Sequence, residues 1–450
     1  MAADLPSDPG AIFEPDVECA EPGSHFAAAD ALWRRQVAYL FAHSPFYQAK
    51  FAAAGLRSPD DAGGLADLAR LPLTYKDELR ASQQDHPPLG AHRAAPLDDI
   101  KRVFSTSGTT GTPSYIPLTA ADRERWLRTS RRAYTAAGIR PHHRVLTTYN
   151  AGPFVAGLVL DTLQSLGCGM IPVGTGNTDR LITALARLKP HVTMGTPSAL
   201  VYIAEAARAR GVDPSACGLA ALVTGGEPGG SEPALRQRIE QAFRARLCEV
   251  LGVGDIGITL WAEGPEQDGM HFCAYGTVHA ELIDPATEQV VPFETGATGE
   301  VVYTHLHHEA APLVRFRSRD HVVVTGTGRV ASGRTGTRIR CIGRTDDMLI
   351  VRGVNLFPSA VREVVARFAP AVTGTILIRP TAKGVRQEPP LPLQVEIPAG
   401  ATPPSGLAAT IEKTVRDVLV VTTRVEFVPP GTIPGGEYKT RLVDFSGATG

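Results

Sequence analysis

The 450-residue chain is 43% hydrophobic and 20% charged, the composition of a globular protein with room for a large core and more than one domain. Its formal net charge of −1 argues against a nucleic-acid-binding protein, which would be basic, and no apolar run reaches the roughly 18 residues that a membrane span needs. The start, MAADLPSDPG, lacks the basic and apolar stretches of a secretory signal. We therefore expect a cytoplasmic protein that binds neither nucleic acid nor membrane.

Two helices are predicted near the start of the chain. Apolar residues recur at helical spacing from Ala28 to Ala54, and Pro45 marks the start of the second helix, which ends at Gly55. The segment from Leu65 to Leu79 follows and leads into the stretch that holds the clearest functional signal.

Five hydroxyl side chains and two glycines fall within seven residues, from Ser105 to Gly111. Glycines let backbone N–H groups turn toward one point, and hydroxyls add donors, so such a loop suits phosphate oxygens. Apolar residues before it and Tyr115 to Leu118 after it place the loop between two strands. A plain surface turn rich in Ser, Thr and Gly is the alternative.

Strands and helices then alternate at the spacing of βαβ units, which predicts a parallel sheet covered on both faces by helices. The predicted strands are 145–149, 170–173, 192–194 and 219–223, and the predicted helices are 121–137, 155–166, 178–188, 197–210 and 232–246. Because such sheets bind ligands at the carboxyl ends of their strands, the loops at those ends are the candidate site.

Two of these loops can line a flat or apolar ligand. The glycines of the loop Gly225-Gly226-Glu227-Pro228 allow close backbone approach. An aromatic-flanked loop follows the strand 145–149 and suits an aromatic or apolar acid, although Phe154 has core packing as a rival role. Its candidate residues are Tyr149, Asn150, Gly152 and Phe154.

From Gly276 onward, alternating polar and apolar residues predict antiparallel strands in a small barrel-like subdomain. After residue 345, helices at 359–367 and 407–419 and strands at 375–378, 393–397 and 424–428 predict a compact α+β module. The fold class expected is therefore α/β, with a large domain over residues 1–345 and a small mobile domain over 346–450.

The hydroxyl-rich loop resembles the phosphate-binding loop of adenylate-forming enzymes, the acyl-CoA ligase and luciferase superfamily, which reads roughly S-S/T-S-G-T-T-G-x-P-K. Three other segments resemble the phenylacetate–CoA ligase branch: HSPFY at 43–47, LPLTYKDELR at 71–80, and GRTDDMLIVRGVNLFP at 343–358, which matches the hinge of those enzymes. The resemblance runs from about Ala28 to Asp444. It implies an ATP-dependent ligase that adenylates an aryl or apolar carboxylate and passes the acyl group to CoA.

The resemblance also implies roles for individual residues. Asp255 would bind Mg²⁺, Asp320 the ribose hydroxyls, Arg344 would face the nucleotide, Asp346 would be the hinge, and Lys439 would contact the acyl carboxylate and the α-phosphate. The phosphate contacts implied are Ser105, Thr106, Ser107, Gly108, Thr109, Thr110 and Gly111, and the adenine contacts are Gly225, Gly226, Glu227, Pro228, Leu251 and Gly252.

Four positions depart from the family pattern. Leu251 stands where the family has tyrosine and Asp255 where it has glutamate, while Thr112 and Ser114 replace the usual lysines of the loop, so positive charge has to come from elsewhere. These changes keep other readings open. The activated group could pass to a carrier-protein thiol, an amine or another nucleophile, or the chain could be a non-catalytic nucleotide-binding homologue.

Oligomeric state, disulfides and zinc are the remaining questions. The sequence does not decide the oligomeric state, and a homodimer is one of the alternatives. Six cysteines without Cys-x-x-Cys spacing indicate no disulfide framework. A zinc site is the less favoured interpretation of the histidines and cysteines His271, Cys273, His305, His307, His308 and Cys341.

Overall fold

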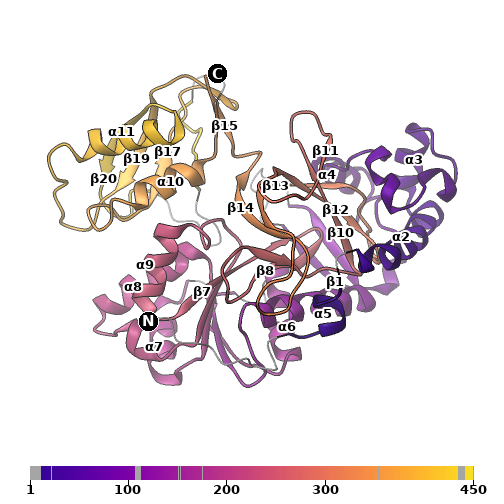
Figure 1. Cartoon of the computed structure of the whole chain (residues 1–450), viewed down its shortest axis with the longest axis horizontal. Helices are drawn as coiled ribbons and strands as arrows, with labels where there is room; N and C mark the ends of the chain where they lie inside the picture. The colour runs from indigo at the N-terminus through magenta and orange to yellow at the C-terminus, as the bar shows by residue number, and fades with distance from the viewer. Residues whose placement is uncertain are drawn as a thin grey trace.

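A computed structural model of the chain describes residues 12–21, 23–106, 113–149, 152, 154–174, 176–352, 354–433 and 441–448. A large body is built around one sheet, with helices α2 (Ser24–His43) and α3 (Pro45–Ala53) at one end and a smaller C-terminal unit at the other (Figure 1). No helix among the described residues is long and apolar enough to cross a membrane.

The two opening helices form as predicted and anchor a distant strand region. Ser44 separates them: it ends α2, and its hydroxyl accepts the N–H of Tyr47 in α3, whose first residue is Pro45. Trp33 and Tyr47 are fully buried. The Tyr47 hydroxyl accepts the backbone N–H of Val314 at 2.8 Å, which ties the N-terminal helices to the antiparallel part of the sheet.

The hydroxyl-rich segment lies between two strands, as predicted, and the structure shows that these strands are antiparallel. Strands β1 (Ile100–Ser105) and β2 (Tyr115–Thr119) pair with Ser105 opposite Tyr115. The N–H of Thr106 donates to the carbonyl of Ser114 at 2.9 Å and extends the pairing by one step. Residues 107–112 of the loop lie outside the described residues.

Five parallel strands form one side of a 12-stranded sheet, in the order β7-β6-β5-β3-β4. Alternate residues of these strands face opposite layers. Val145 and Val223 pack with one set of helices, and their neighbours Leu146 and Leu222 pack with the other. The strands are β3 (Arg144–Thr147), β4 (Gly169–Pro172), β5 (Val192–Gly195), β6 (Ala221–Thr224) and β7 (Arg246–Val253). The predicted parallel sheet with both faces covered is therefore confirmed.

Helices α5 (Ala120–Ala136) and α6 (Leu158–Ser165) cover the first face of these strands. Helices α7 (Thr178–Leu188), α8 (Pro197–Ala209) and α9 (Pro233–Phe243) cover the second. Both α8 and α9 begin with a proline, which fixes the backbone angle of the first helical residue where no N–H is needed.

The antiparallel strands predicted from Gly276 onward lie in the rest of the same sheet, joined by two strands before Gly276 that the sequence pattern did not indicate. They continue from β7 in the order β8-β9-β14-β13-β12-β10-β11. These strands are β8 (Gly257–Glu263), β9 (Met270–Phe272), β10 (Val278–Ile283), β11 (Val290–Val291), β12 (Thr298–His305), β13 (Phe316–Gly326) and β14 (Arg338–Arg344). The barrel-like closure expected for this region is not confirmed, because its strands extend the parallel sheet through β8 and β9 instead of forming a separate one.

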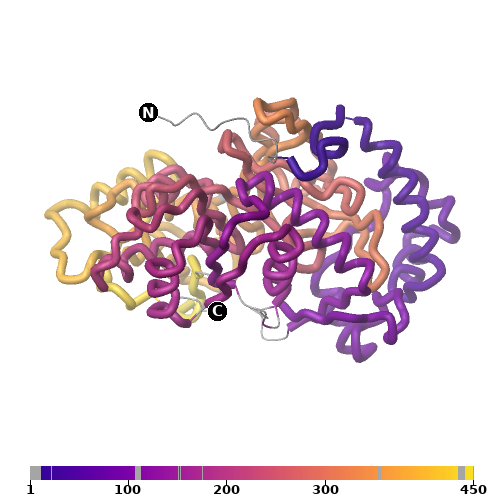
Figure 2. Tube along the Cα trace, turned by 90° about the horizontal axis from the view of Figure 1, so that it is seen from below, coloured from indigo at the N-terminus to yellow at the C-terminus, as the bar shows by residue number. Residues whose placement is uncertain are grey.

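The C-terminal unit is α+β, as predicted, and has its own core. Every member of its main apolar cluster lies between Leu349 and Val443. Its principal elements are α10 (Pro358–Ala366), β17 (Ile376–Ile378), β19 (Leu391–Glu396), α11 (Leu407–Leu419) and β20 (Thr423–Val428). Figures 1 and 2 both place this unit beside α8 and α9. The domain boundary at 345/346 stays a prediction.

Candidate active site

The predicted acid and adenine loops meet at the carboxyl ends of the parallel strands. The hydroxyl of Tyr149, which follows β3, donates to the carbonyl oxygen of Gly225, which follows β6, at 2.9 Å. Burial raises the pKa of the Tyr149 hydroxyl, and nearby Tyr134 and Glu227 raise it further, so the group keeps its proton and remains a donor. Two segments 76 residues apart in sequence are thereby held together.

The predicted adenine loop, residues 225–228, has little room for larger residues. A methyl group at Gly225 would lie 2.9 Å from both the Cγ2 atom and the carbonyl oxygen of Val250, and Gly226 has a φ of +92°, in the left-handed region. The Glu227 carboxylate accepts the backbone N–H of Ser198 at 2.8 Å, which links the loop to the start of α8. The close contact at Gly225 and the backbone angle of Gly226 therefore explain why glycine occupies these two positions.

The hairpin of β1 and β2, which carries the predicted phosphate loop, reaches the same place. Ser105, the last residue of β1, forms a parallel bridge with Phe154 of the predicted acid loop. The turn between β7 and β8 packs against both: a methyl group at Gly254 would lie 3.7 Å from Ile116 of β2 and from Val155. The segments predicted to hold phosphate, acid and metal therefore converge at one edge of the sheet.

Asp255 lies in that turn and faces a cation. Its Oδ2 accepts from the ammonium of Lys76, the first residue of α4 (Lys76–Asp85), at 2.5 Å. The Asp255 side chain is 9% exposed and that of Lys76 is 31% exposed. The buried His305 holds the turn in place, since its Nε2 donates to the carbonyl of Ile256 at 3.0 Å while its Nδ1 accepts the N–H of Leu313. The structure thus presents the predicted Mg²⁺ ligand as a carboxylate on a fixed turn.

Leu251 and Gly252, the other predicted adenine residues, lie in β7 just before this turn. Leu251 pairs with Trp261 of β8, and its side chain packs against the apolar cluster that includes Trp261.

Among the described residues, no three His, Cys, Asp or Glu side chains are grouped so that they could hold a metal ion.

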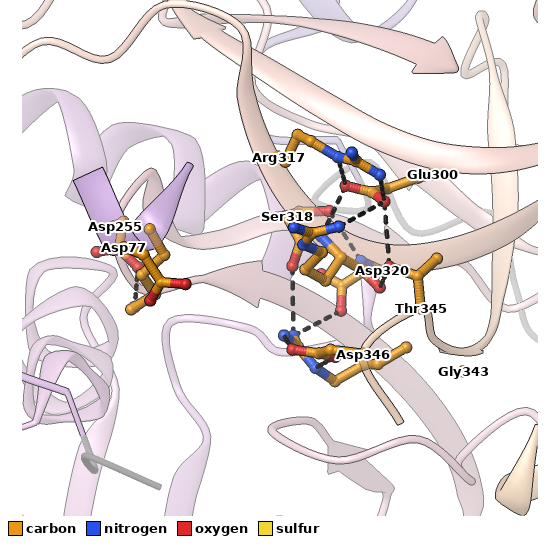
Figure 3. A network of polar contacts seen from close by, with 12 residues as sticks. Asp77, Asp255, Glu300, Arg317, Ser318, Asp320, Gly343, Thr345 and Asp346 are labelled. Carbon is orange, nitrogen blue, oxygen red and sulfur yellow. Dashed lines mark hydrogen bonds and ion pairs between the residues drawn. The ribbon is translucent and has the colours of Figure 1, made fainter. Parts of the chain in front are cut away.

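The predicted ribose, nucleotide and hinge residues share one polar network. Arg344, at the end of β14, donates through Nη1 to Oδ1 of Asp320 at 3.2 Å and through Nε and Nη2 to the two carboxylate oxygens of Asp346 at 2.9 and 2.8 Å. Burial alone would lower the pKa of the Arg344 guanidinium, but Asp320 and Asp346 raise it above its ordinary value. Figure 3 shows Asp320 and Asp346 near one another, with Asp255 and Asp77 to one side.

The residue before Asp346 is fixed to the large body. The Thr345 hydroxyl donates to Glu300 at 3.1 Å, and its N–H donates to the Arg319 carbonyl at 2.7 Å. The fully buried Glu300 in turn accepts two hydrogen bonds from Arg317, at 2.9 and 2.7 Å (Figure 3). A firm anchor immediately before Asp346 is what a hinge residue needs on one side.

Part of the predicted site lies outside the described residues. These positions are Ser107, Gly108, Thr109, Thr110, Gly111, Asn150 and Lys439. Conversely, the structure adds Lys76, which sequence analysis gave no role. Its place in the LPLTYKDEL segment marks it as part of the resemblance, but its partner is 179 residues away in the chain.

Glu249 is a buried acid with no role predicted from the sequence, and it contacts the chain just after the predicted adenine loop. It lies on β7, accepts the N–H of Gly230 at 2.9 Å, and is 4% exposed. Burial, followed by the charge of nearby Glu263, raises the pKa of the Glu249 carboxyl from 4.5 to about 7. Because the folded chain then binds the proton more tightly than the unfolded chain, stability is lost as pH rises from about 4.5 to about 7.

Replacing Glu249 with glutamine is expected to remove this loss. The free energy of unfolding of Glu249→Gln, relative to that of wild type, should be higher at pH 8 than at pH 5 by up to about 3 kcal/mol. Denaturant unfolding of both proteins at the two pH values measures the difference. The exposed Glu388, changed to Gln, is the control and should show no such gain. An equal stability difference at both pH values would contradict the pKa shift.

Comparisons with known proteins agree with this geometry. The sequence profile of the AMP-binding enzyme family matches residues 42–306, and that of the AMP-binding enzyme C-terminal domain matches residues 353–444. Phenylacetate-coenzyme A ligase of Thermus thermophilus is 32% identical over 95% of this chain and 97% of its own. That of Pseudomonas putida is 34% identical over 76% and 77%.

Solved structures of 2-hydroxyisobutyryl-CoA ligase share the fold. In its postadenylation state with 2-HIB-AMP, that protein is 30% identical, superposes with a TM-score of 0.87, and the match covers 98% of this chain and 94% of that one. In its thioesterification state with 2-HIB-AMP and CoA, the TM-score is 0.70, with coverage of 97% and 93%. The resemblance inferred from the sequence motifs is confirmed, and the chain belongs to the AMP-binding enzyme family.

Proposed function

We propose that this chain is an ATP-dependent carboxylic acid–CoA ligase that joins an aryl or otherwise apolar acid to CoA through an acyl-adenylate. Relatives named phenylacetate-coenzyme A ligase and the fold shared with 2-hydroxyisobutyryl-CoA ligase support this activity. The observation that carries the proposal is the convergence of the phosphate, acid, adenine and Asp255 segments at the carboxyl edge of one sheet. Open α/β sheets bind their ligands at that edge.

In the first step, the acid's carboxylate oxygen attacks the α-phosphorus of ATP and pyrophosphate leaves. The catalytic work assigned to the protein is positioning and the stabilisation of negative charge on the phosphates. The loop 105–111 supplies backbone and hydroxyl donors, Asp320 accepts hydrogen bonds from the ribose hydroxyls, and Lys439 contacts the α-phosphate. The Arg344 guanidinium holds the Asp320 carboxylate in place from the next strand.

Asp255 is the proposed ligand of Mg²⁺. The residues present fit this ion, because Mg²⁺ commonly takes one or two carboxylates and fills its other positions with water and substrate phosphates. The Asp255 carboxylate already faces one cation, the ammonium of Lys76. When bound, Mg²⁺ supplies charge stabilisation on the phosphates. Lys76 adds a second positive charge next to Asp255. The usual lysines of the phosphate loop are replaced by Thr112 and Ser114 in this sequence.

In the second step, the thiol sulfur of CoA attacks the acyl carbon of the adenylate and AMP leaves. We place the change between the steps at Asp346, where residues 346–450 turn relative to the large domain. The separate core of the C-terminal unit and the anchoring of Thr345 on Glu300 support this boundary.

Acid-dependent ATP–pyrophosphate exchange over a panel of carboxylic acids tests the proposal, with hydroxylamine trapping of the adenylate. We expect exchange with an aryl or apolar acid, and a CoA thioester when CoA is added. Exchange without a thioester would point to a carrier-protein thiol, an amine or another nucleophile as the acceptor. Intact ATP binding with no exchange for any acid would identify a non-catalytic homologue and overturn the assignment.

A further inference from the structure

One side chain of the C-terminal unit reaches the end of the proposed adenine loop. Arg362, on α10, is 7% exposed, and its Nη2 donates to the carbonyl oxygen of Pro228 at 2.5 Å. The same guanidinium pairs with Glu232, with Nη2 at 2.8 Å from Oε1 and Nε at 3.3 Å from Oε2. An arginine after Asp346 is thus held by a carbonyl and a carboxylate that come before it in the chain.

A glycine at position 229 leaves space for this guanidinium. Gly229 has a φ of +134°, and a methyl group there would lie 2.7 Å from the Arg362 Nη2. A larger residue would therefore be strained and would also displace the arginine. On the other side, the N–H of Gly230 donates to Glu249 of β7. The loop's end is held between the C-terminal unit and the sheet.

These contacts depend on the pose of the C-terminal unit. Any rotation at Asp346 carries Arg362 away from Pro228 and Glu232, because only Arg362 lies after the rotating bond. The Glu232 side chain is 12% exposed, so it would lose its partner in a largely buried place. The pose seen here superposes better with the postadenylation state of 2-hydroxyisobutyryl-CoA ligase than with its thioesterification state, with TM-scores of 0.87 and 0.70.

We propose that Arg362 is a positioning residue that couples the pose of the C-terminal unit to the order of the adenine loop. In the present pose the guanidinium fixes Pro228 and Glu232. Turning the unit withdraws the guanidinium and releases the end of the loop. The consequence for catalysis rests on the proposed function: adenylation needs the ordered loop, whereas transfer from a finished adenylate proceeds in a pose without this contact.

Hydrogen exchange of the full-length, ligand-free protein tests the coupling without any activity. Arg362→Met and Glu232→Gln should each speed amide exchange in the 225–232 segment by about tenfold, since each removes a charged hydrogen-bonded partner. The double variant should be no faster than either single variant, because the two residues act as a pair. Arg367→Met is the control: Arg367 pairs with Glu363 of the same helix and should leave the segment unchanged.

The two half-reactions supply a second readout. Arg362→Met is expected to lower ATP–pyrophosphate exchange about tenfold while thioester formation from supplied acyl-adenylate and CoA stays at the wild-type rate. Unchanged exchange kinetics of the 225–232 amides would overturn the coupling, and so would faster amide exchange confined to residues 354–433, which indicates simple destabilisation of the unit. If the wild type adenylates no acid, the proposed function fails, and the amide measurement still decides the role of Arg362.

Discussion

Replacing Lys439 with alanine is expected to lower acid-dependent ATP–pyrophosphate exchange by about 100-fold or more, while thioester formation from preformed acyl-adenylate continues at close to the wild-type rate. The lysine is proposed to stabilise charge on the α-phosphate only while pyrophosphate is leaving, and losing one such preorganised donor costs about 10²–10³ in rate. Once the adenylate exists, that charge no longer develops, so the second step does not need this side chain.

The measurement compares pyrophosphate exchange with thioester formation from synthetic acyl-adenylate and CoA. Lys383→Ala is a matched control, because Lys383 is an exposed lysine of the same C-terminal unit and has no proposed contact with ATP. Wild-type exchange in Lys439→Ala would show that the role given to Lys439 is wrong. Equal losses in both half-reactions would indicate damage to the fold of the unit instead.

A second large effect is expected at Gly252, where alanine should destabilise the protein by about 3 kcal/mol. A methyl group at this position would overlap the carbonyl oxygen of Ile258 on the neighbouring strand β8. Backbone in a paired strand cannot move aside as the end of a flexible side chain can. The β7–β8 pairing would have to shift, and with it the turn that carries Asp255.

Gly254→Ala, two residues further in the same hairpin, is the matched control. Its methyl group would meet only side-chain carbons, at 3.7 Å, which is ordinary contact. Thermal unfolding, followed by circular dichroism, should show a clear fall in the midpoint for Gly252→Ala and little change for Gly254→Ala. Equal midpoints for the two variants would contradict the packing described for β7 and β8.

Local patterns were enough for most elements of the fold. The bounds predicted for the helices 178–188 and 407–419 match α7 and α11, because each has a clear apolar stripe and a distinct end. The sheet's full extent was not predictable in this way. Strand β14 pairs with β9, with Arg338 opposite His271, and no local pattern predicts a partner 67 residues away.

The candidate site was also predictable only in part: its loops were, and its charged pairs were not. Glycine- and hydroxyl-rich loops indicate ligand contact by their composition, and the structure brings the described ones to a single edge of the sheet. Charged pairs such as Lys76–Asp255 and Arg362–Glu232 join residues 179 and 130 positions apart. Each partner is one of 91 charged side chains in the chain, 45 basic and 46 acidic, so sequence alone does not select the pair.

The location of the nucleotide is the central claim, and a crystal structure with a non-hydrolysable ATP analogue and Mg²⁺ tests it most directly. We predict that the adenine lies against residues 225–228, that the ribose hydroxyls donate to the Asp320 carboxylate, and that the phosphates lie between the loop 105–111 and Asp255. A nucleotide bound at any other place on the molecule would contradict this account of the site.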